Sequence, residues 1–189
     1  MSVVHIARGL WRWTAPHPEW SEDADWPREV GCVYYEAPDA VVLIDPLVPR
    51  DRERFFEALD ADVARLSRPV AIVLTVSWHD RSAAELSERY EARRGTPPGG
   101  VVELPIAGAD ETAYWIPEHL ALVVGDTLLG HEHEGLSLCP ESWLRGDSRE
   151  AVRSSLRDLL ELPIEHVLTS HGEPVLSVGH AALERALKS

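Results

Sequence analysis

The chain has 189 residues, 44% of them hydrophobic, and carries a formal net charge of −14. A chain of this length buries a core without a disulfide or a structural metal. Its acidic charge disfavours binding to nucleic acid and to anionic membranes. The N-terminal residues lack the basic and then apolar pattern of a signal peptide, and no apolar run is long enough to span a membrane. We therefore expect a cytoplasmic protein with neither nucleic acid nor membrane as a partner.

Cysteine spacing and the distribution of tryptophan add two further expectations. Cys32 and Cys139 lie far apart and in no metal-like spacing, so we expect two buried, reduced thiols. The first 26 residues contain four of the seven tryptophans. These rings either cover a sheet edge or loop or form an aromatic wall beside a cleft. They are Trp11, Trp13, Trp20 and Trp26.

The first half of the chain alternates between strand-like and helix-like patterns. A β-branched and aromatic segment, 3–14, is punctuated by a glycine, and a proline-broken loop, 15–30, follows it. Segments 31–37 and 40–46 indicate a hairpin. A helical face of Phe55, Leu59, Val63 and Leu66 precedes the buried strand 69–76. Ser82 and Glu85 then form a capping box that begins a helix, and Gly95 ends it.

The second half repeats the alternation. Three short strands are predicted within 99–108, 111–117 and 119–126, and another within 164–170. Between them, Asp147 and Glu150 frame a capping box for a helix whose apolar stripe is Val152, Leu156, Leu159 and Leu160. A short closing helix is predicted over 179–188. Strands in both halves with helices between them indicate an α/β fold with two sheets covered by helices.

Several apolar strands end abruptly in polar residues. The strand ends carry Asp45, the pair His79 and Asp80, Asp126 and His171. Each residue alone is explained by a turn, which Asp and His often favour. In open α/β folds, however, ligands gather at the carboxyl ends of strands. The series as a whole therefore indicates one cleft.

Four segments in this order resemble the metallo-β-lactamase fold superfamily over nearly the whole chain. They are "VVLIDPLVP", "IVLTVSWHDRSAAEL", "GADETAYWIPEHLALVVGDTLLG" and "EHVLTSHGEP". In that family the second segment usually reads Thr-His-x-His-x-Asp-His, the third has Gly-His-Thr and Gly-Asp-Thr, and the fourth ends in Gly-His-Gly. The resemblance implies a four-layer αββα sandwich formed by a single domain over 1–189.

The resemblance also implies a degenerate metal centre. Val76 and Trp78 stand where the first two histidines are expected, and Ala109 or Asp110 where the third is expected. A site without these histidines should not hold an ion, so the dinuclear centre of the family is lost. The residues retained are Asp80, Asp126 and His171. Two carboxylates and one imidazole suit at most a single zinc, iron or manganese ion.

His79 and Arg81 flank the retained Asp80. In an extended segment, side chains alternate, so His79 would point away from the site if Asp80 points into it. If the segment turns there, His79 is a replacement ligand or a general base. Arg81 either pairs with Asp80 or Asp126 and replaces the ion, or steadies a developing oxyanion. The candidate catalytic residues are therefore Asp80, Arg81 and His79.

Three other histidines have open roles. His17 lies in the long loop 15–30, where it is either a surface residue or a further ligand. His131 and His133 form a His-x-His pair just after Asp126. Such a pair is typical of metal sites, but in an exposed loop it is more often solvated.

Two hypotheses of function follow, and the sequence leaves open whether the chain is an enzyme. The first is a divergent protein without the dinuclear centre that is catalytically silent or binds a small ligand. The alternative is a mononuclear metal-dependent hydrolase of an ester, thioester or lactone. A third option is metal-free chemistry with His79 or His171 as general base and Arg81 as support. A small molecule is the expected ligand or substrate, and no oligomeric state is indicated.

Overall fold

The computed structural model describes residues 2–133, 135–144 and 148–188. Contacts within the chain divide it into two compact units. Unit 1 comprises residues 1–74 and 78–101, and unit 2 comprises residues 75–77 and 102–189. No helix within the described ranges is both long and apolar enough to cross a membrane.

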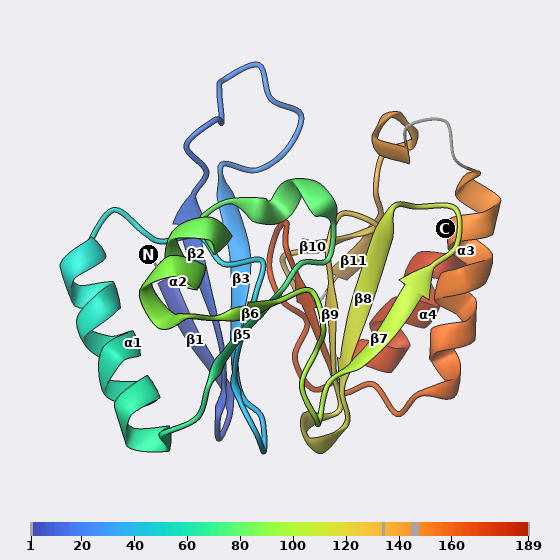
Figure 1. The fold of residues 1–189 in the computed structure, drawn as a ribbon. Coiled ribbons are helices and arrows are strands. Elements are labelled where there is room, and N and C mark those ends of the chain that lie inside the picture. The colour runs from blue at the N-terminus through green and yellow to red at the C-terminus, as the bar shows by residue number, and fades with distance from the viewer. Residues whose placement is uncertain (1, 134, 145–147, 189) are drawn as a thin grey trace. The chain divides into compact units, whose positions relative to one another are not determined.

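Unit 1 contains one sheet of six strands in the order β1-β2-β3-β4-β5-β6 (Figure 1). Neighbours from β1 to β4 are antiparallel, and β4, β5 and β6 are parallel. The strands are β1 Ser2–Ala7, β2 Leu10–Pro16, β3 Glu29–Glu36, β4 Val41–Ile44, β5 Val70–Val73 and β6 Arg93–Arg94. The helices are α1 Arg52–Leu66 and α2 Ala83–Tyr90.

Alternate residues of the unit 1 strands form a core with the two helices. Trp13, Leu43 and Ile72 from the sheet pack in one buried cluster with Leu59 of α1 and Leu86 of α2. Strands β4 and β5 are buried along their whole length, as the uninterrupted apolar pattern predicts. The predicted hairpin of β3 and β4 and the apolar face of α1 are confirmed.

Unit 2 contains a four-stranded sheet in the order β12-β9-β8-β7 and a two-stranded sheet, β10-β11. Strands β12 and β9 are parallel, and the other pairs are antiparallel. The strands are β7 Val102–Ile106, β8 Glu111–Ile116, β9 Ala121–Val124, β10 Leu128–His131, β11 Gly135–Leu138 and β12 His166–Thr169. The helices are α3 Arg149–Asp158 and α4 Gly179–Lys188.

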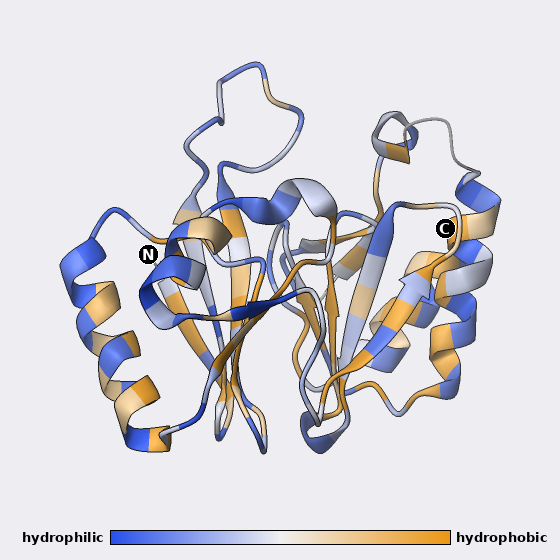
Figure 2. Ribbon diagram, in the orientation of Figure 1, coloured by the Kyte–Doolittle hydropathy of each residue, from blue (hydrophilic) through white to orange (hydrophobic). Residues whose placement is uncertain are grey.

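The core of unit 2 lies between the four-stranded sheet and its two helices. Val152 and Leu156 of α3 and Leu183 of α4 pack with Leu122 and Val167 of the sheet. Figure 2 shows the strands as mostly hydrophobic and the helices as striped with hydrophilic residues. This striping is the pattern of helices that bury one side.

Four short 3-10 helices complete the described structure, and one of them carries candidate site residues. That turn, η1, spans Ser77–Asp80 and follows β5. The others are η2 Pro117–His119, η3 Glu141–Leu144 and η4 Leu159–Glu161. Both cysteines are free and buried, as expected.

Several local predictions differ from the structure. The strand-like segment 3–14 is two antiparallel strands, and the glycine expected to punctuate it, Gly9, adopts a φ of 78° where the chain reverses. His131, expected in a loop, is the last residue of strand β10 and lies opposite Gly135 of β11. The helix α2 ends at Tyr90 rather than at Gly95, because Glu91 takes the left-handed conformation that closes it.

Both predicted capping boxes are wrong in their detail. Ser82 is the N-cap of α2, but its side chain makes no capping bond. Its hydroxyl instead accepts a hydrogen bond of 2.9 Å from the Val48 amide. Asp147 lies outside the described residues, and the N-cap of α3 is Ser148, whose hydroxyl accepts from the Ala151 amide.

The Ser148 cap gives a first prediction. Replacing Ser148 by Ala removes the acceptor for one of the amides that the first helical turn leaves without a partner. We expect the free energy of unfolding to fall by about 1 kcal/mol. The matched control is Ser154→Ala in the exposed part of the same helix, which should be neutral or slightly stabilising. Urea denaturation measures both, and equal effects of the two variants would contradict the assignment.

Candidate functional site

Two of the retained residues meet in unit 2. Asp126 follows β9 and His171 follows β12, and these strands are parallel neighbours with Val124 opposite Thr169. The Ser170 amide continues the pairing by donating to the Val124 carbonyl. The two side chains therefore emerge at the same edge of the sheet, and Asp126 Oδ1 lies 3.2 Å from His171 Nε2. The sequence prediction that these strand ends converge holds for this pair.

A buried carboxylate holds the loop that carries Asp126. Glu111, at the start of β8, is 5% exposed. Its Oε1 accepts from the Gly125 amide at 3.0 Å and from the Thr127 hydroxyl at 2.8 Å. Its Oε2 accepts from the amides of Asp126 and Thr127, both at 2.8 Å. Glu111 thus fixes the backbone on both sides of Asp126.

Sequence reasoning missed Glu111 as a site residue. The signal available was an acidic residue at the first position of an otherwise apolar strand, "ETAYWI". Its partners are 14 to 16 positions away, and neither periodicity nor a local motif links the two segments. Gly125 completes the arrangement, because a Cβ there would lie 2.5 Å from the Thr75 hydroxyl and 3.2 Å from the Glu111 carboxyl carbon.

The environment of Glu111 favours its protonated form. Burial is the largest cause that raises its pKa, and the charge of Asp126 is the second. Hydrogen bonds from Thr127 and Gly125 stabilise the ionised form and oppose the shift. The net result raises the pKa of Glu111 to about 7.

Backbone contacts position His171. Its carbonyl accepts a hydrogen bond of 2.9 Å from the Gly130 amide of β10. The next residue, Gly172, has a φ of 81°, and a Cβ on it would lie 1.9 Å from the Gly130 carbonyl oxygen. Only glycine fits there. The ring of Trp143 packs edge-on against the imidazole, with centroids 5.4 Å apart.

Unit 1 contributes a second carboxylate–histidine pair. His79 Nδ1 lies 2.9 Å from Asp45 Oδ2, and the two side chains are 5% and 2% exposed. Asp45 directly follows β4 and has a φ of 50°, an uncommon conformation for a residue other than glycine. Its amide donates to the Val73 carbonyl at 3.1 Å.

The segment around His79 is a 3-10 turn rather than an extended strand. Residues 77–80 form η1, so the alternation of side chains expected of a strand does not apply to His79 and Asp80. His79 is buried, whereas the Asp80 side chain is 49% exposed and pairs with Arg94. Of these two adjacent residues, it is the histidine that turns into the protein.

Arg81 also has partners within unit 1. One of its terminal nitrogens donates to the carbonyls of Gly31 and Asp45, both at 3.0 Å. Arg81 has a φ of 40°, which these contacts help to hold. Asp80, one of the two carboxylates that the guanidinium was expected to pair with, is engaged by Arg94 instead. Arg81 thus ties β3 to the residue that contacts His79.

The positions where the resemblance expects histidines carry no imidazole. Val76 is buried in the core, and Trp78 is 37% exposed. Ala109 packs against the core of unit 2, and Asp110 is exposed. Three of these four side chains therefore have no atom that binds a metal ion.

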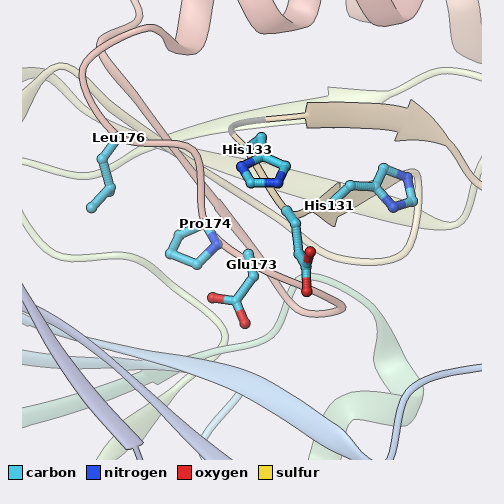
Figure 3. A pocket seen from close by; sticks show the side chains of 6 residues that line it. His131, His133, Glu173, Pro174 and Leu176 are labelled. Atoms are coloured by element: carbon cyan, nitrogen blue, oxygen red, sulfur yellow. The ribbon is translucent and has the colours of Figure 1, made fainter.

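His17 and His131 have partners of their own. The ring of His17 packs edge-on against Trp26 at 5.1 Å, and its Nδ1 accepts from the Glu19 amide. His131 Nε2 lies 2.7 Å from the Ser137 hydroxyl across the hairpin of β10 and β11. Figure 3 shows His131 and His133 with Glu173, Pro174 and Leu176 around an open pocket of about 390 Å³.

Comparison with solved structures identifies the fold. The chain superposes on VMB-1 with a TM-score of 0.65 and 11% identity, covering 99% of this chain and 94% of that one. DIM-1 metallo-β-lactamase exposed to ceftazidime gives a TM-score of 0.63 and 13% identity, covering 99% of this chain and 96% of that one. A metallo-β-lactamase from Erythrobacter litoralis gives a TM-score of 0.62 and 15% identity, covering 98% of this chain and 90% of that one.

Sequence comparison adds nothing to this: no family model and no curated protein matches the chain. The identities are 11% to 15%, so the likeness is one of fold. The chain has the metallo-β-lactamase fold, and the predicted fold class is confirmed.

The raised pKa of Glu111 predicts a pH dependence of stability. Its pKa is about 7 in the folded protein, against 4.5 for an unperturbed glutamate side chain. The folded state therefore binds this proton more tightly than the unfolded state, and the contribution is fully present below pH 4.5 and lost as the pH rises through 7. The difference in unfolding free energy between wild type and Glu111→Gln should fall by up to about 3 kcal/mol over that range.

Urea denaturation at several pH values measures this difference. Glu103→Gln, on the exposed part of β7, is the control and should show no such pH dependence. A constant difference between wild type and Glu111→Gln from pH 4.5 to pH 8 would contradict the raised pKa. At pH 8 the variant should still be less stable by about 1 to 3 kcal/mol, because the Gln amide offers fewer acceptors to the four donors.

Proposed function

We propose that the protein is a mononuclear metal-dependent hydrolase. Asp126 and His171 hold one divalent ion in this proposal, and His79 is the third ligand. The single observation that carries the proposal is the Asp45–His79 hydrogen bond of 2.9 Å in a buried environment. Metal-binding histidines almost always donate their other ring N–H to a carboxylate or carbonyl in this way.

The donor pair in unit 2 fits an ion. Ligands of a tetrahedral zinc ion at bond lengths of about 2.0 Å are about 3.3 Å apart. Asp126 Oδ1 and His171 Nε2 are 3.2 Å apart. A carboxylate and an imidazole at this separation support coordination of one ion, and Glu111 keeps the Asp126 backbone in place for it.

The donor in unit 1 fits as well. When His79 donates from Nδ1 to Asp45, the ring is neutral and its lone pair is on Nε2, which is the form that binds metals. His79 replaces Asp80 in the proposed ligand set, because the Asp80 carboxylate is at the surface with Arg94.

A single ion is favoured over two. Val76, Trp78 and Ala109 offer no donor where the resemblance expects three histidines. A catalytic zinc usually has three protein ligands, and two imidazoles with one carboxylate supply that number. The same set also suits iron or manganese. A fourth position then remains for water or substrate.

The chemistry follows from this donor set. A bound ion would lower the pKa of a water molecule toward neutrality, which suits attack on the carbonyl of an ester, thioester or lactone. Asp45 orients His79, Glu111 orients the Asp126 loop, and Arg81 holds the backbone of Asp45. Roles for Asp80 as ligand and for Arg81 at the oxyanion stay predictions from the sequence.

A catalytically silent protein or small-ligand binder is the second candidate. The observation that favours it is the loss of donors at Val76, Trp78 and Ala109. It differs from the first candidate in retaining no ion after purification and in hydrolysing no carbonyl substrate.

Metal content separates the two candidates. The untagged protein, incubated with zinc, iron or manganese and then desalted, should retain about one equivalent by elemental analysis. Asp126→Ala and His171→Ala should each lose it, since two of three ligands rarely hold an ion. Asp80→Asn and His131→Ala are the matched controls and should retain it. The same samples are assayed with ester, thioester and lactone substrates.

Each outcome has a clear meaning. Metal lost in the Asp126 and His171 variants but kept in both controls supports the proposal, and hydrolysis that follows metal content supports the activity. Absence of bound metal in the wild type would contradict it, as would two equivalents. Equal metal in the wild type and in His79→Ala would remove His79 from the ligand set.

Asp45 provides a separate test of ligand orientation. Asp45→Asn keeps the size of the side chain, and Asn tolerates the positive φ of this position. It removes the negative charge that orients the imidazole. We expect metal affinity to fall by about 10- to 100-fold with folding retained. Competition with a chromophoric chelator measures the affinity, and an unchanged value would show that Asp45 does not orient His79.

A further inference from the structure

Unit 1 contains an aromatic groove that plays no part in the proposed hydrolysis. It has a volume of about 390 Å³ and lies between α1 and one face of β1 to β4. Trp11, Trp13, Tyr34 and Phe55 line it, with Arg54 and Asp62 as the charged residues. The tryptophan-rich N-terminal segment, for which the sequence left an aromatic wall as one alternative, thus contributes two rings to a groove.

The groove follows from the register of the strands. Trp11 and Trp13 are two residues apart on β2, so their side chains lie on the same face of the sheet. Trp11 is opposite Tyr34 on β3, and their ring centroids are 5.3 Å apart. Phe55 of α1 closes on Trp13 at 5.8 Å. These contacts give the groove a rigid aromatic lining.

The helix places unlike charges along the groove. Arg54 and Asp62 are eight positions apart on α1, which is about 12 Å along the axis. Asp62 pairs with Arg65 at 2.7 Å, and Arg65 also pairs with Glu36. The Arg54 side chain is exposed, and no ion pair to it is found in the described part of the chain. The cation at this end is therefore available to an outside anion.

We propose that this groove binds an elongated apolar carboxylate. The apolar body lies along the aromatic rings, and the carboxylate pairs with Arg54 near the N-terminus of α1. Apolar pockets of this volume with a few polar groups are typical small-molecule sites. Guanidinium–carboxylate pairs are among the stronger hydrogen-bonded contacts. The site lies entirely within unit 1, so it does not depend on metal binding.

Other occupants are disfavoured by the same residues. Aromatic rings also attract organic cations, but Arg54 would repel a cation at the open end. A second copy of the chain would bring a protein surface with a net charge of −14. Two chains of this charge repel each other, which makes a second copy a less favourable occupant than a small carboxylate.

The test uses ten-carbon probes that differ only in their head group. Decanoate, decanol and decyltrimethylammonium are titrated into the full chain, with tryptophan fluorescence and calorimetry as readouts. Arg54→Gln should weaken decanoate binding by at least about tenfold and leave decanol unchanged. Arg52→Gln removes the same charge from the same helix outside the groove. It should change the affinity for decanoate and for decanol by no more than about twofold.

A second variant tests the location of the site. Ala58 is exposed and lines the groove, so Ala58→Trp fills it without a change in the core. This variant should abolish binding of decanoate and of decanol while retaining the wild-type circular dichroism spectrum.

Several results would overturn the proposal. They are absence of saturable decanoate binding, equal losses for Arg54→Gln and Arg52→Gln, and tighter binding of decyltrimethylammonium than of decanoate. A wild-type dimer in sedimentation that Ala58→Trp converts to a monomer would also overturn it, because a second copy would then cover the groove. None of these results bears on metal content, so the two proposals fail independently.

Discussion

The buried carboxylate of Glu111 accepts hydrogen bonds from three successive backbone amides and one hydroxyl around Asp126. A loop at the end of a short strand has no ladder to define it, and its amides need acceptors when they are buried. Glu111 supplies those acceptors from the neighbouring strand. The position of Asp126, and its distance from His171, therefore depend on a residue that takes no part in binding. The charge of Asp126 is also one cause of the raised pKa of Glu111. A cation held by Asp126 would offset that charge, so ion binding and the ionised form of Glu111 favour each other.

The Asp45–His79 pair in unit 1 is a second case of a carboxylate that contacts a candidate ligand or its loop. Asp45 adopts a positive φ, and Val73 and Arg81 contact its backbone on either side. Residues held in uncommon conformations persist where the surrounding contacts determine them, and they concentrate at functional sites. Arg81, which the sequence suggested as a substitute for the ion, contributes here to the backbone that orients a histidine. The chain thus has supporting contacts around its candidate ligands, although the histidines that the resemblance expects at Val76, Trp78 and Ala109 are absent.

The elements that the sequence predicted well are those set by local patterns. Strand ends at Asp45, Asp126 and His171 could be found because an apolar run stops at a polar residue, and parallel strands bring such ends together. Glu111 could not be found, because its role arises from pairing β8 with a loop far along the chain. For His79 the sequence left two orientations open, because it could not show that residues 77–80 form a 3-10 turn. The hydroxyl of Ser82 was expected to cap its own helix, but it accepts a hydrogen bond from the distant Val48 amide instead.

The most direct measurement is anomalous diffraction from crystals of the protein loaded with zinc, iron or manganese. We expect one anomalous peak, from an ion with His79 Nε2, His171 Nε2 and a carboxylate oxygen of Asp126 as its ligands. Asp45 should still be hydrogen-bonded to His79 Nδ1. Two peaks, no peak, or a single peak at His131 and His133 would contradict it.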